Sequence, residues 1–145
     1  MLRAFGGIVV GYIAMAIFIT VVFVCLFLAL GVDRAFQPDS YEVSTLWIAI
    51  SLGISLGGAI LGGYLCAAVG KSLRACKALA VIVVVLGLLL CLPSMKRGEG
   101  PNVRAGEVPN FEAMQLGVTP IWAHLLTPVL GAVGVLLGAR MKKAQ

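Results

Sequence analysis

Side chains able to carry out chemistry are few in this chain and lie far apart. The cysteines form no Cys-x-x-Cys pair, so the chain lacks the motif that thiol–disulfide oxidoreductases use. We expect these thiols to serve as small buried hydrophobes, because a free cysteine packs like one. A disulfide between Cys25 and Cys91, which fall in the outer halves of their segments, is the alternative. The four positions are Cys25, Cys66, Cys76 and Cys91.

His124 is the only histidine. A bis-histidine haem needs two axial ligands, which a symmetric dimer would supply but one chain would not. A single histidine can also contact a pigment or a quinone. The simpler interpretation, which we favour, is an interfacial histidine hydrogen-bonded to a neighbouring helix or a lipid headgroup. One histidine and no cysteine pair rule out structural zinc. The sequence therefore predicts no metal and no cofactor, and His124 is a speculative ligand-binding residue.

Isolated hydroxyls are the other polar groups of the apolar stretches, namely Thr20, Ser51, Ser55 and Thr127. In membrane helices such groups usually bond to the preceding turn or to a neighbouring helix. The alternative is that they line a pore or carrier for a small neutral solute. We find no nucleophile elbow, phosphate loop or nucleophile–base pair, so we predict no catalytic residue and no enzyme. The apolar stretches also lack the membrane-embedded glutamate on which small multidrug exporters depend.

Composition decides which elements hold these residues. Apolar residues make up 61% of the chain and charged residues 12%, too few to cover a soluble surface. A bilayer core of about 30 Å needs about 20 apolar residues in a helix. Four uncharged stretches satisfy this, and we predict an all-α integral membrane four-helix bundle forming one domain over 1–145. The predicted spans are about 5–31, 44–69, 78–95 and 118–139.

The predicted connections are outer loops 32–43 and 96–117 and a cytoplasmic turn 70–77. The first span is too long for the apolar core of a cleaved signal peptide, so we expect it to be retained. Gly70 is expected as the C-cap glycine of the second span. Pro128 falls inside the fourth span, where we expect a kink.

Charge predicts the orientation. The two termini and the middle turn carry seven Lys or Arg and no acid, whereas the other two connections carry all six acids beside four Lys or Arg. Short basic segments stay in the cytoplasm, so we expect both termini in the cytoplasm of a multi-pass protein of the inner membrane. The expected partner of these cations is anionic lipid, and nucleic acid is excluded. The cations are Arg3, Lys71, Arg74, Lys77, Arg140, Lys142 and Lys143.

Tryptophans support the same orientation. Trp47 and Trp122 lie just inside the starts of the second and fourth spans. Tryptophan prefers the membrane–water interface, so we predict both as interface anchors on the outer side.

Glycine gathers at four-residue spacing in three spans. Small residues let helix backbones approach closely in lipid, where apolar side chains gain little from one another. A parallel stripe of Ser51, Ser55, Ala59, Gly63 and Ala67 makes the second span small on most sides, so we expect it at the centre and the aliphatic third span facing lipid. The stripes either pack within the chain, as we favour, or contact another subunit. The predicted packing residues are Gly7, Gly11, Gly53, Gly57, Gly58, Gly62, Gly131, Gly134 and Gly138.

The run Gly62-Gly63-Tyr64-Leu65-Cys66-Ala67-Ala68, followed by a basic turn and an aliphatic helix, resembles a pattern seen in small uncharacterised four-pass proteins of bacterial inner membranes. The ending resembles them as well, with Trp122, a Gly-rich run over 130–138 and a basic tail. The resemblance implies an inner-membrane location and brings no activity, cofactor or catalytic residue.

These observations favour a non-enzymatic small integral membrane protein, either self-associating or an accessory subunit of a larger membrane complex. Two alternatives stay open. One is a pore or carrier for a small neutral solute, and the other is a pigment- or haem-binding subunit that uses His124.

Overall fold

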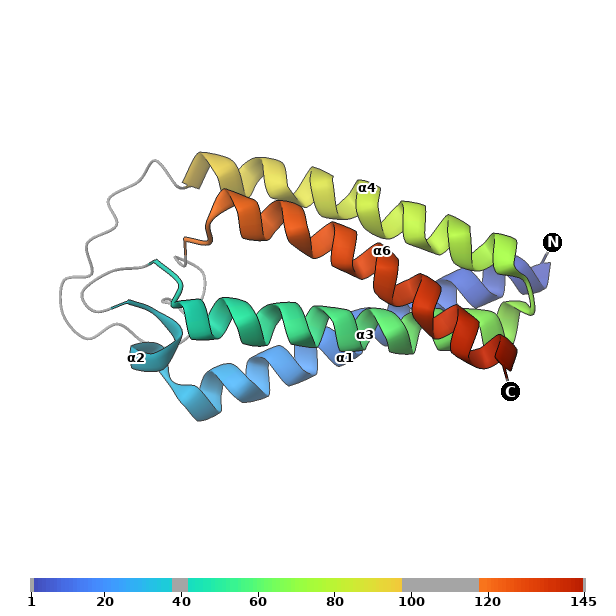
Figure 1. Ribbon diagram of the computed structural model, residues 1–145, viewed down its shortest axis with the longest axis horizontal. Coiled ribbons are helices and arrows are strands. Elements are labelled where there is room, and N and C mark those ends of the chain that lie inside the picture. The colour runs from blue at the N-terminus through green and yellow to red at the C-terminus, as the bar shows by residue number, and fades with distance from the viewer. Residues whose placement is uncertain (1, 38–41, 98–117, 145) are drawn as a thin grey trace.

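The computed structural model describes residues 2–37, 42–97 and 118–144, without the side chains of 32–33, 93–97 and 143–144. Its long helices are α1 (Leu2–Leu30), α3 (Thr45–Gly70), α4 (Leu73–Arg97) and α6 (Ile121–Ala144), and α2 (Val32–Ala35) is a single turn. The four long helices lie side by side as an elongated bundle, with the chain ends and the α3–α4 turn at one end (Figure 1). The predicted all-α class is confirmed, and all four helices are long and apolar enough to cross a membrane.

The helices extend beyond the predicted apolar spans. α4 begins at Leu73, so its charged first turn is helical and the α3–α4 connection is only Lys71 and Ser72. The reason is that lysine and arginine are good helix formers. A charged residue therefore marks the end of an apolar stretch in the sequence, but the helix itself extends past that residue. We call the end that holds this turn and the chain ends the basic end, and the opposite end the loop end.

Gly70 does not have the predicted C-cap role. The residue in the left-handed conformation is Lys71, with φ 47° and ψ 27°, and its amide donates to the carbonyl of Ala67 at 3.0 Å. Gly70 is still helical and lies against α1, where a Cβ added to Gly7 would stand 2.7 Å from the Gly70 Cα. Close packing therefore requires glycine at position 7, whereas a Cβ on Gly70 would meet no atom closer than 3.5 Å.

Backbone and side-chain hydrogen bonds fix the start of α3 at the loop end. Ser44 caps the helix, since its Oγ accepts from the amide of Trp47 at 3.2 Å and donates to the carbonyl of Arg34 at 2.8 Å. The Val43 amide donates to the carbonyl of Val118 at 3.0 Å. This bond ties the segment before α3 to the segment before α6.

An aromatic cluster fills the same end of the bundle. Trp47 lies edge-on to Phe23 and Phe27, with ring centroids 4.9 and 5.5 Å apart, and Phe27 lies edge-on to Phe36 at 6.2 Å. Edge-to-face pairs at these distances add to the gain from apolar burial. The cluster joins α1, α3 and the connection that carries α2.

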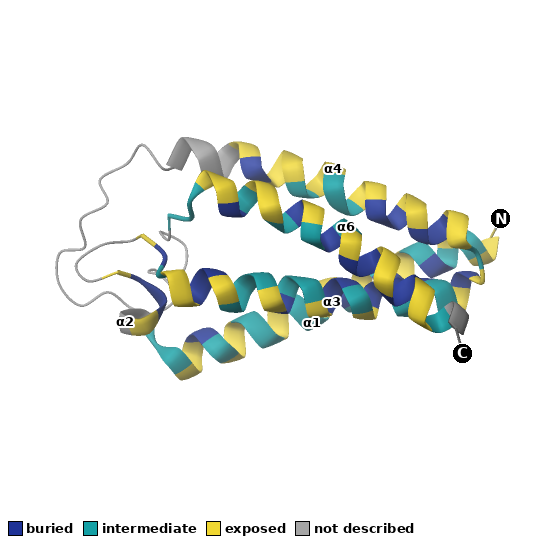
Figure 2. Cartoon of the chain, in the orientation of Figure 1, coloured by how far each residue is buried: buried dark blue, intermediate teal, exposed yellow. Residues whose placement is uncertain are grey.

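α3 is the central helix, as its small residues predict, and it packs along its length against α1 on one side and α6 on the other. A Cβ on Gly11 would lie 2.6 Å from the Gly62 carbonyl oxygen, and one on Gly62 would lie 2.8 Å from that of Gly11. On the other side, a Cβ on Gly63 would overlap the Val135 carbonyl. These glycines bring the backbones together. Figure 2 shows buried residues along α3 where it lies among its neighbours.

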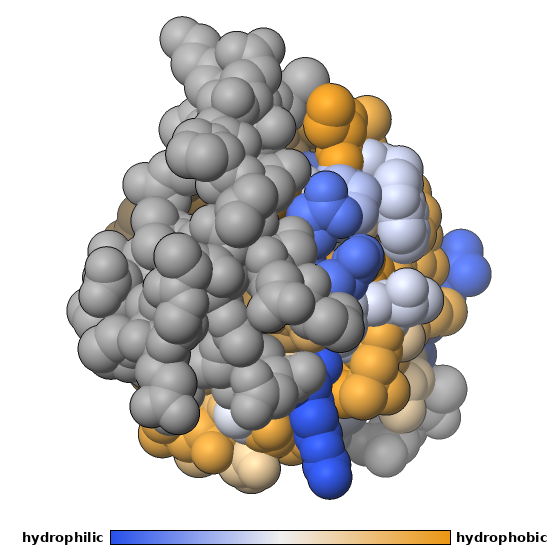
Figure 3. Space-filling model, turned by 90° about the vertical axis from the view of Figure 1, so that its left-hand side faces the viewer, coloured by the Kyte–Doolittle hydropathy of each residue, from blue (hydrophilic) through white to orange (hydrophobic). Residues whose placement is uncertain are grey.

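The outward surface is largely apolar. Large aliphatic side chains are exposed along α1 and α4, among them Ile13, Ile17, Val85 and Leu89, and the described residues include no buried polar or charged side chain. Continuous apolar exposure on this scale is typical of a surface that contacts lipid. Figure 3 looks onto the loop end, where hydrophilic residues gather with apolar residues exposed around them.

Adding one methyl group at a backbone contact should destabilise the bundle. In Gly63→Ala and Gly138→Ala the new Cβ meets the carbonyl of Val135 or Ile60, which belongs to a packed helix and cannot move aside. We expect each to lose roughly 1–3 kcal/mol, as overpacked cores do. Thermal unfolding in detergent micelles, followed by circular dichroism, measures the loss.

Gly6→Ala is the matched control, since nothing lies within 4 Å of its added Cβ. It should melt at the same temperature as the parent or higher, because alanine favours helix over glycine by about 1 kcal/mol. Equal melting of all three variants would contradict the packing described here.

Candidate functional site

The predicted packing glycines divide into two groups. Seven lie against a neighbouring helix, where an added Cβ would come within 3 Å of another atom. Gly53 and Gly57 differ: nothing lies within 4 Å of a Cβ on Gly53, and only a Phe18 ring carbon, at 3.9 Å, meets one on Gly57. The seven in contact are Gly7, Gly11, Gly58, Gly62, Gly131, Gly134 and Gly138.

Gly87 is a packing residue that the sequence did not indicate. It lies on α4 among bulky aliphatic residues, and a Cβ there would stand 2.7 Å from Cγ of Pro128 on α6. No other glycine lies four residues from Gly87, so the repeat that marks the other contacts is missing. The sequence feature that accompanies this contact is Pro128, which lies inside α6 as predicted and is buried.

Gly53 and Gly57 belong to an outward face of α3. Ala49, Gly53 and Gly57 follow one another at four-residue spacing and all three are exposed. Residues four apart lie on the same side of a helix. We call these three residues the α3 small-residue face, and it looks out between the sides of α3 that contact α1 and α6.

The predicted cations lie together at the basic end. Lys71, Arg74 and Lys142 line a cavity of about 660 Å³, and the Lys142 Nζ also stands 5.5 Å from the centre of the Tyr64 ring. This contact has the range of a cation–π interaction. Arg3, Lys77 and Arg140 are exposed and outside the cavity. The side chain of Lys143 lies outside the described residues.

Three of the four isolated hydroxyls considered as pore-lining groups lie with His124 around two adjoining cavities near the loop end. The larger, about 350 Å³, lies among α1, α3, α4 and α6, and the smaller, about 200 Å³, extends toward Trp47. Ser55, His124 and Thr127 line both, and Ser51 lines the smaller. Thr20 is exposed on α1 and lines neither. We call the two together the loop-end cavity.

The polar groups of the loop-end cavity differ in how they are paired. The hydroxyls of Ser51 and Thr127 donate to carbonyls of their own helices, Trp47 at 2.7 Å and Ala123 at 2.8 Å. Within the described part of the chain, the hydroxyl of Ser55 and the ring of His124 have no hydrogen-bond partner. These two groups are therefore available to a molecule in the cavity.

The loop-end cavity does not continue to the basic end. The two share no lining residue, and side chains of α3, α4 and α6 between them are completely buried. Leu79 and Val135 are the largest of these, each with no exposed surface. The bundle is therefore hollowed at both ends and closed between them.

The two tryptophans have different surroundings. Trp122 is 56% exposed on the outer side of α6, as an interface anchor requires, whereas Trp47 is 5% exposed. Trp47 does not have the predicted contact with the interface, because it belongs to the aromatic cluster beside Phe23 and Phe27. Its apolar area is buried against protein rather than headgroups.

All four cysteines are free thiols, so Cys25 and Cys91 form no disulfide here. Cys66, Cys76 and Cys91 are buried and Cys25 is exposed. The Sγ of Cys91 donates to the carbonyl of His124 at 3.3 Å, which links α4 to α6 beside the loop-end cavity. In the described part of the chain, His, Cys, Asp and Glu side chains form no group of three that would hold a metal ion.

Comparison of the chain with protein-family models, with curated proteins and with solved structures gave no match.

Proposed function

We propose that this chain is a non-enzymatic structural membrane protein that self-associates through the α3 small-residue face. The observation that carries the proposal is the open space beside Gly53 and Gly57, set against the close backbone contacts that the other predicted packing glycines make. Helices that approach closely in lipid do so through small residues at this spacing. A second copy presents the same face, so a two-fold contact would bring two α3 helices together.

The surrounding surface supports this choice. Where α1 and α4 are exposed they carry bulky aliphatic residues, such as Ile13, Ile17, Val85 and Leu89. Glycine within a helix lowers its stability by about 0.5–1 kcal/mol relative to alanine. If Gly53 and Gly57 faced only lipid, they would destabilise α3 and make no compensating contact. A close helix partner accounts for them.

Leucine on this face should separate the copies and leave the bundle folded. Gly53→Leu and Ala49→Leu place a large side chain where the fold has open space, and we expect each to weaken self-association tenfold or more. Resonance energy transfer between labelled copies in lipid vesicles, measured against protein density, gives the association constant.

The control is Ala16→Leu, which adds the same bulk to an exposed position of α1. It should associate as the parent does. A parent protein that stays monomeric at every density would refute the proposal, and so would equal weakening by all three variants.

We also infer that the basic end faces the cytoplasm of a multi-pass inner-membrane protein. The described cations of this end have no acid among them, whereas Glu42 lies at the loop end. Lysine and arginine are retained on the cytoplasmic side. Three more cations, Arg140, Lys142 and Lys143, follow the fourth predicted span in the sequence.

Reporter fusions at Gln145 test this orientation. Green fluorescent protein fused there should fluoresce, and alkaline phosphatase fused there should be inactive, because each matures on only one side of the membrane. Fusions after Gln37 in the first loop should give the reverse pattern. An active phosphatase at the C-terminus would overturn the orientation.

A second candidate function is a carrier site for a small neutral solute in the loop-end cavity. The specific observation is that the Ser55 hydroxyl and the His124 ring line the cavity and have no hydrogen-bond partner among the described residues. Unpaired polar groups away from water cost about 1–3 kcal/mol each, so a hydrogen-bonding solute would stabilise them. The closed region around Leu79 and Val135 favours a gated carrier over an open pore.

Solute uptake separates this second candidate from the first. Vesicles containing the protein should take up glycerol faster than protein-free vesicles, and Ser55→Ala with His124→Phe should remove at least nine-tenths of the difference. Ser51→Ala is the control, because its hydroxyl already bonds to its own helix. Uptake equal to that of protein-free vesicles would end the carrier hypothesis, and a colourless purified protein would end the pigment and haem hypothesis.

A further inference from the structure

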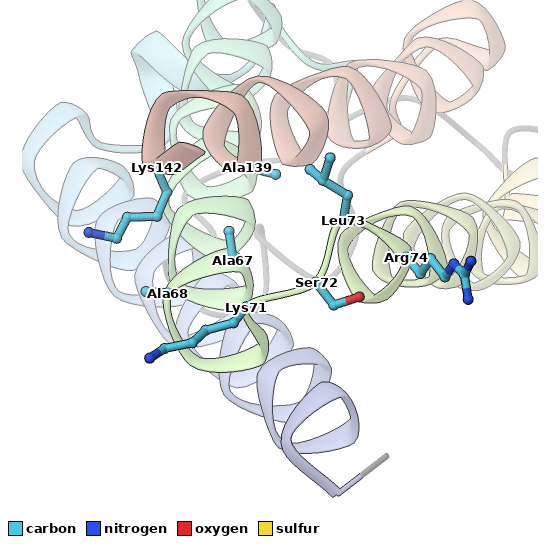
Figure 4. Close-up of a pocket in the computed structure, with 8 residues that line it drawn as sticks. All are labelled: Ala67, Ala68, Lys71, Ser72, Leu73, Arg74, Ala139 and Lys142. Carbon is cyan, nitrogen blue, oxygen red and sulfur yellow. The ribbon is translucent and has the colours of Figure 1, made fainter. Parts of the chain in front are cut away.

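The cavity at the basic end is bounded by four parts of the chain. The last turn of α3, the α3–α4 turn, the first turn of α4 and the end of α6 border a space of about 660 Å³ (Figure 4). Lys71, Arg74 and Lys142 each come from a different one of α4, α6 and the turn. Segments far apart in the sequence therefore bring three positive charges to one cavity.

Among the described residues, no carboxylate balances the charge of these cations. The residues that line the cavity include no aspartate or glutamate, and among the described residues no carboxylate forms an ion pair with the three cations. Figure 4 shows the amino groups of Lys71 and Lys142 extending outward to one side of the turn and the guanidinium of Arg74 extending outward to the other. An anion at the mouth of the cavity would therefore be within reach of flexible cationic side chains from both sides.

The start of α4 adds hydrogen-bond donors. The first amides of a helix have no acceptor within it and carry the positive end of the helix dipole. α4 has no acidic residue in its first turn to meet them. Ser72 lies directly before the helix and lines the cavity, and its hydroxyl has no protein partner in the described structure. This combination of donors suits a phosphate group.

The remaining walls of the cavity are apolar. Ala67 and Ala139 form sides of the space, and the side chain of Leu73 extends from the start of α4 toward α6 (Figure 4). Val69 and Leu73 are exposed at this end, beside the apolar surface of the bundle. A ligand that fits both parts has a phosphate group joined to hydrocarbon.

We propose that this cavity binds the phosphate of one anionic phospholipid. Lys71 and Lys142 reach the headgroup from one side of the turn and Arg74 reaches it from the other. The Ser72 hydroxyl and the first amides of α4 donate hydrogen bonds to it, and the acyl chains follow the apolar surface beside Val69 and Leu73. The recognised chemistry is a phosphate ester, so free inorganic phosphate is the other source to be distinguished. This proposal does not rest on self-association.

A matched pair of triple variants separates a defined site from general attraction to a basic surface. The cavity variant combines Lys71→Gln, Arg74→Gln and Lys142→Gln. The control combines Arg3→Gln, Lys77→Gln and Arg140→Gln, which removes the same charge from the same end but outside the cavity. Native mass spectrometry of the protein titrated with phosphatidylglycerol in micelles counts bound lipids and gives their affinity.

We expect one tightly retained phosphatidylglycerol on the parent and on the control. Each cation near a lipid phosphate contributes roughly fivefold in affinity, so the cavity variant should bind about a hundredfold more weakly. The control should stay within about threefold of the parent. Equal losses in the two variants, or equal retention of phosphatidylcholine, would overturn the proposal.

Two further arms complete the test. Arg74→Gln alone changes an exposed side chain that forms no hydrogen bond or ion pair within the described residues. If the triple variant does not fold, this single variant should still bind the lipid roughly fivefold more weakly than the parent. Inorganic phosphate at millimolar concentration should leave the lipid in place, since it lacks the hydrocarbon part. Displacement of the lipid by inorganic phosphate would assign the site to a free phosphate and overturn the lipid assignment.

Discussion

Close approach of helix backbones to α3 is the constraint on which the bundle depends. Gly11 and Gly62 meet so closely that a Cβ on either would reach the carbonyl oxygen of the other, and Gly63 meets the carbonyl of Val135 on the opposite side of α3. In lipid, apolar side chains gain little by leaving hydrocarbon for one another, so dispersion between closely spaced backbones must hold the helices. α3 is therefore the helix against which both α1 and α6 pack.

The positions of the cavities follow from where this constraint operates. The contacts are tight from the middle of the bundle toward the basic end, where Gly7 and Gly70 lie together, and they loosen toward the loop end. There the space between α3 and α6 is bordered by Ser55, Thr127 and His124 rather than filled by backbone. The aromatic cluster around Trp47 then closes the end of the bundle. One helix thus organises both the packed and the hollow regions.

Much of this arrangement could be predicted from the sequence, because uncharged length and small-residue content are properties of whole helices. The four helices and the central position of α3 belong to this class. What could not be predicted depends on direction around a helix: Gly53 and Gly58 have the same four-residue repeat, yet one faces outward and the other packs against Ile19. For the same reason the sequence did not show that Thr20 is exposed while Ser55 lines a cavity. Nor did it show that Trp47 is buried while Trp122 is exposed.

The short α3–α4 connection has a consequence for how the bundle is built during synthesis. A connection of two residues makes α3 and α4 a helical hairpin, yet α4 packs more extensively against α6 than against α3. α6 follows α4 in the sequence, so during synthesis α4 has its sequence neighbour α3 before it has its main neighbour in space. The contact of Gly87 with Pro128 becomes available only after α6 has been synthesised. Until then α4 lacks the helix that covers most of its packed surface.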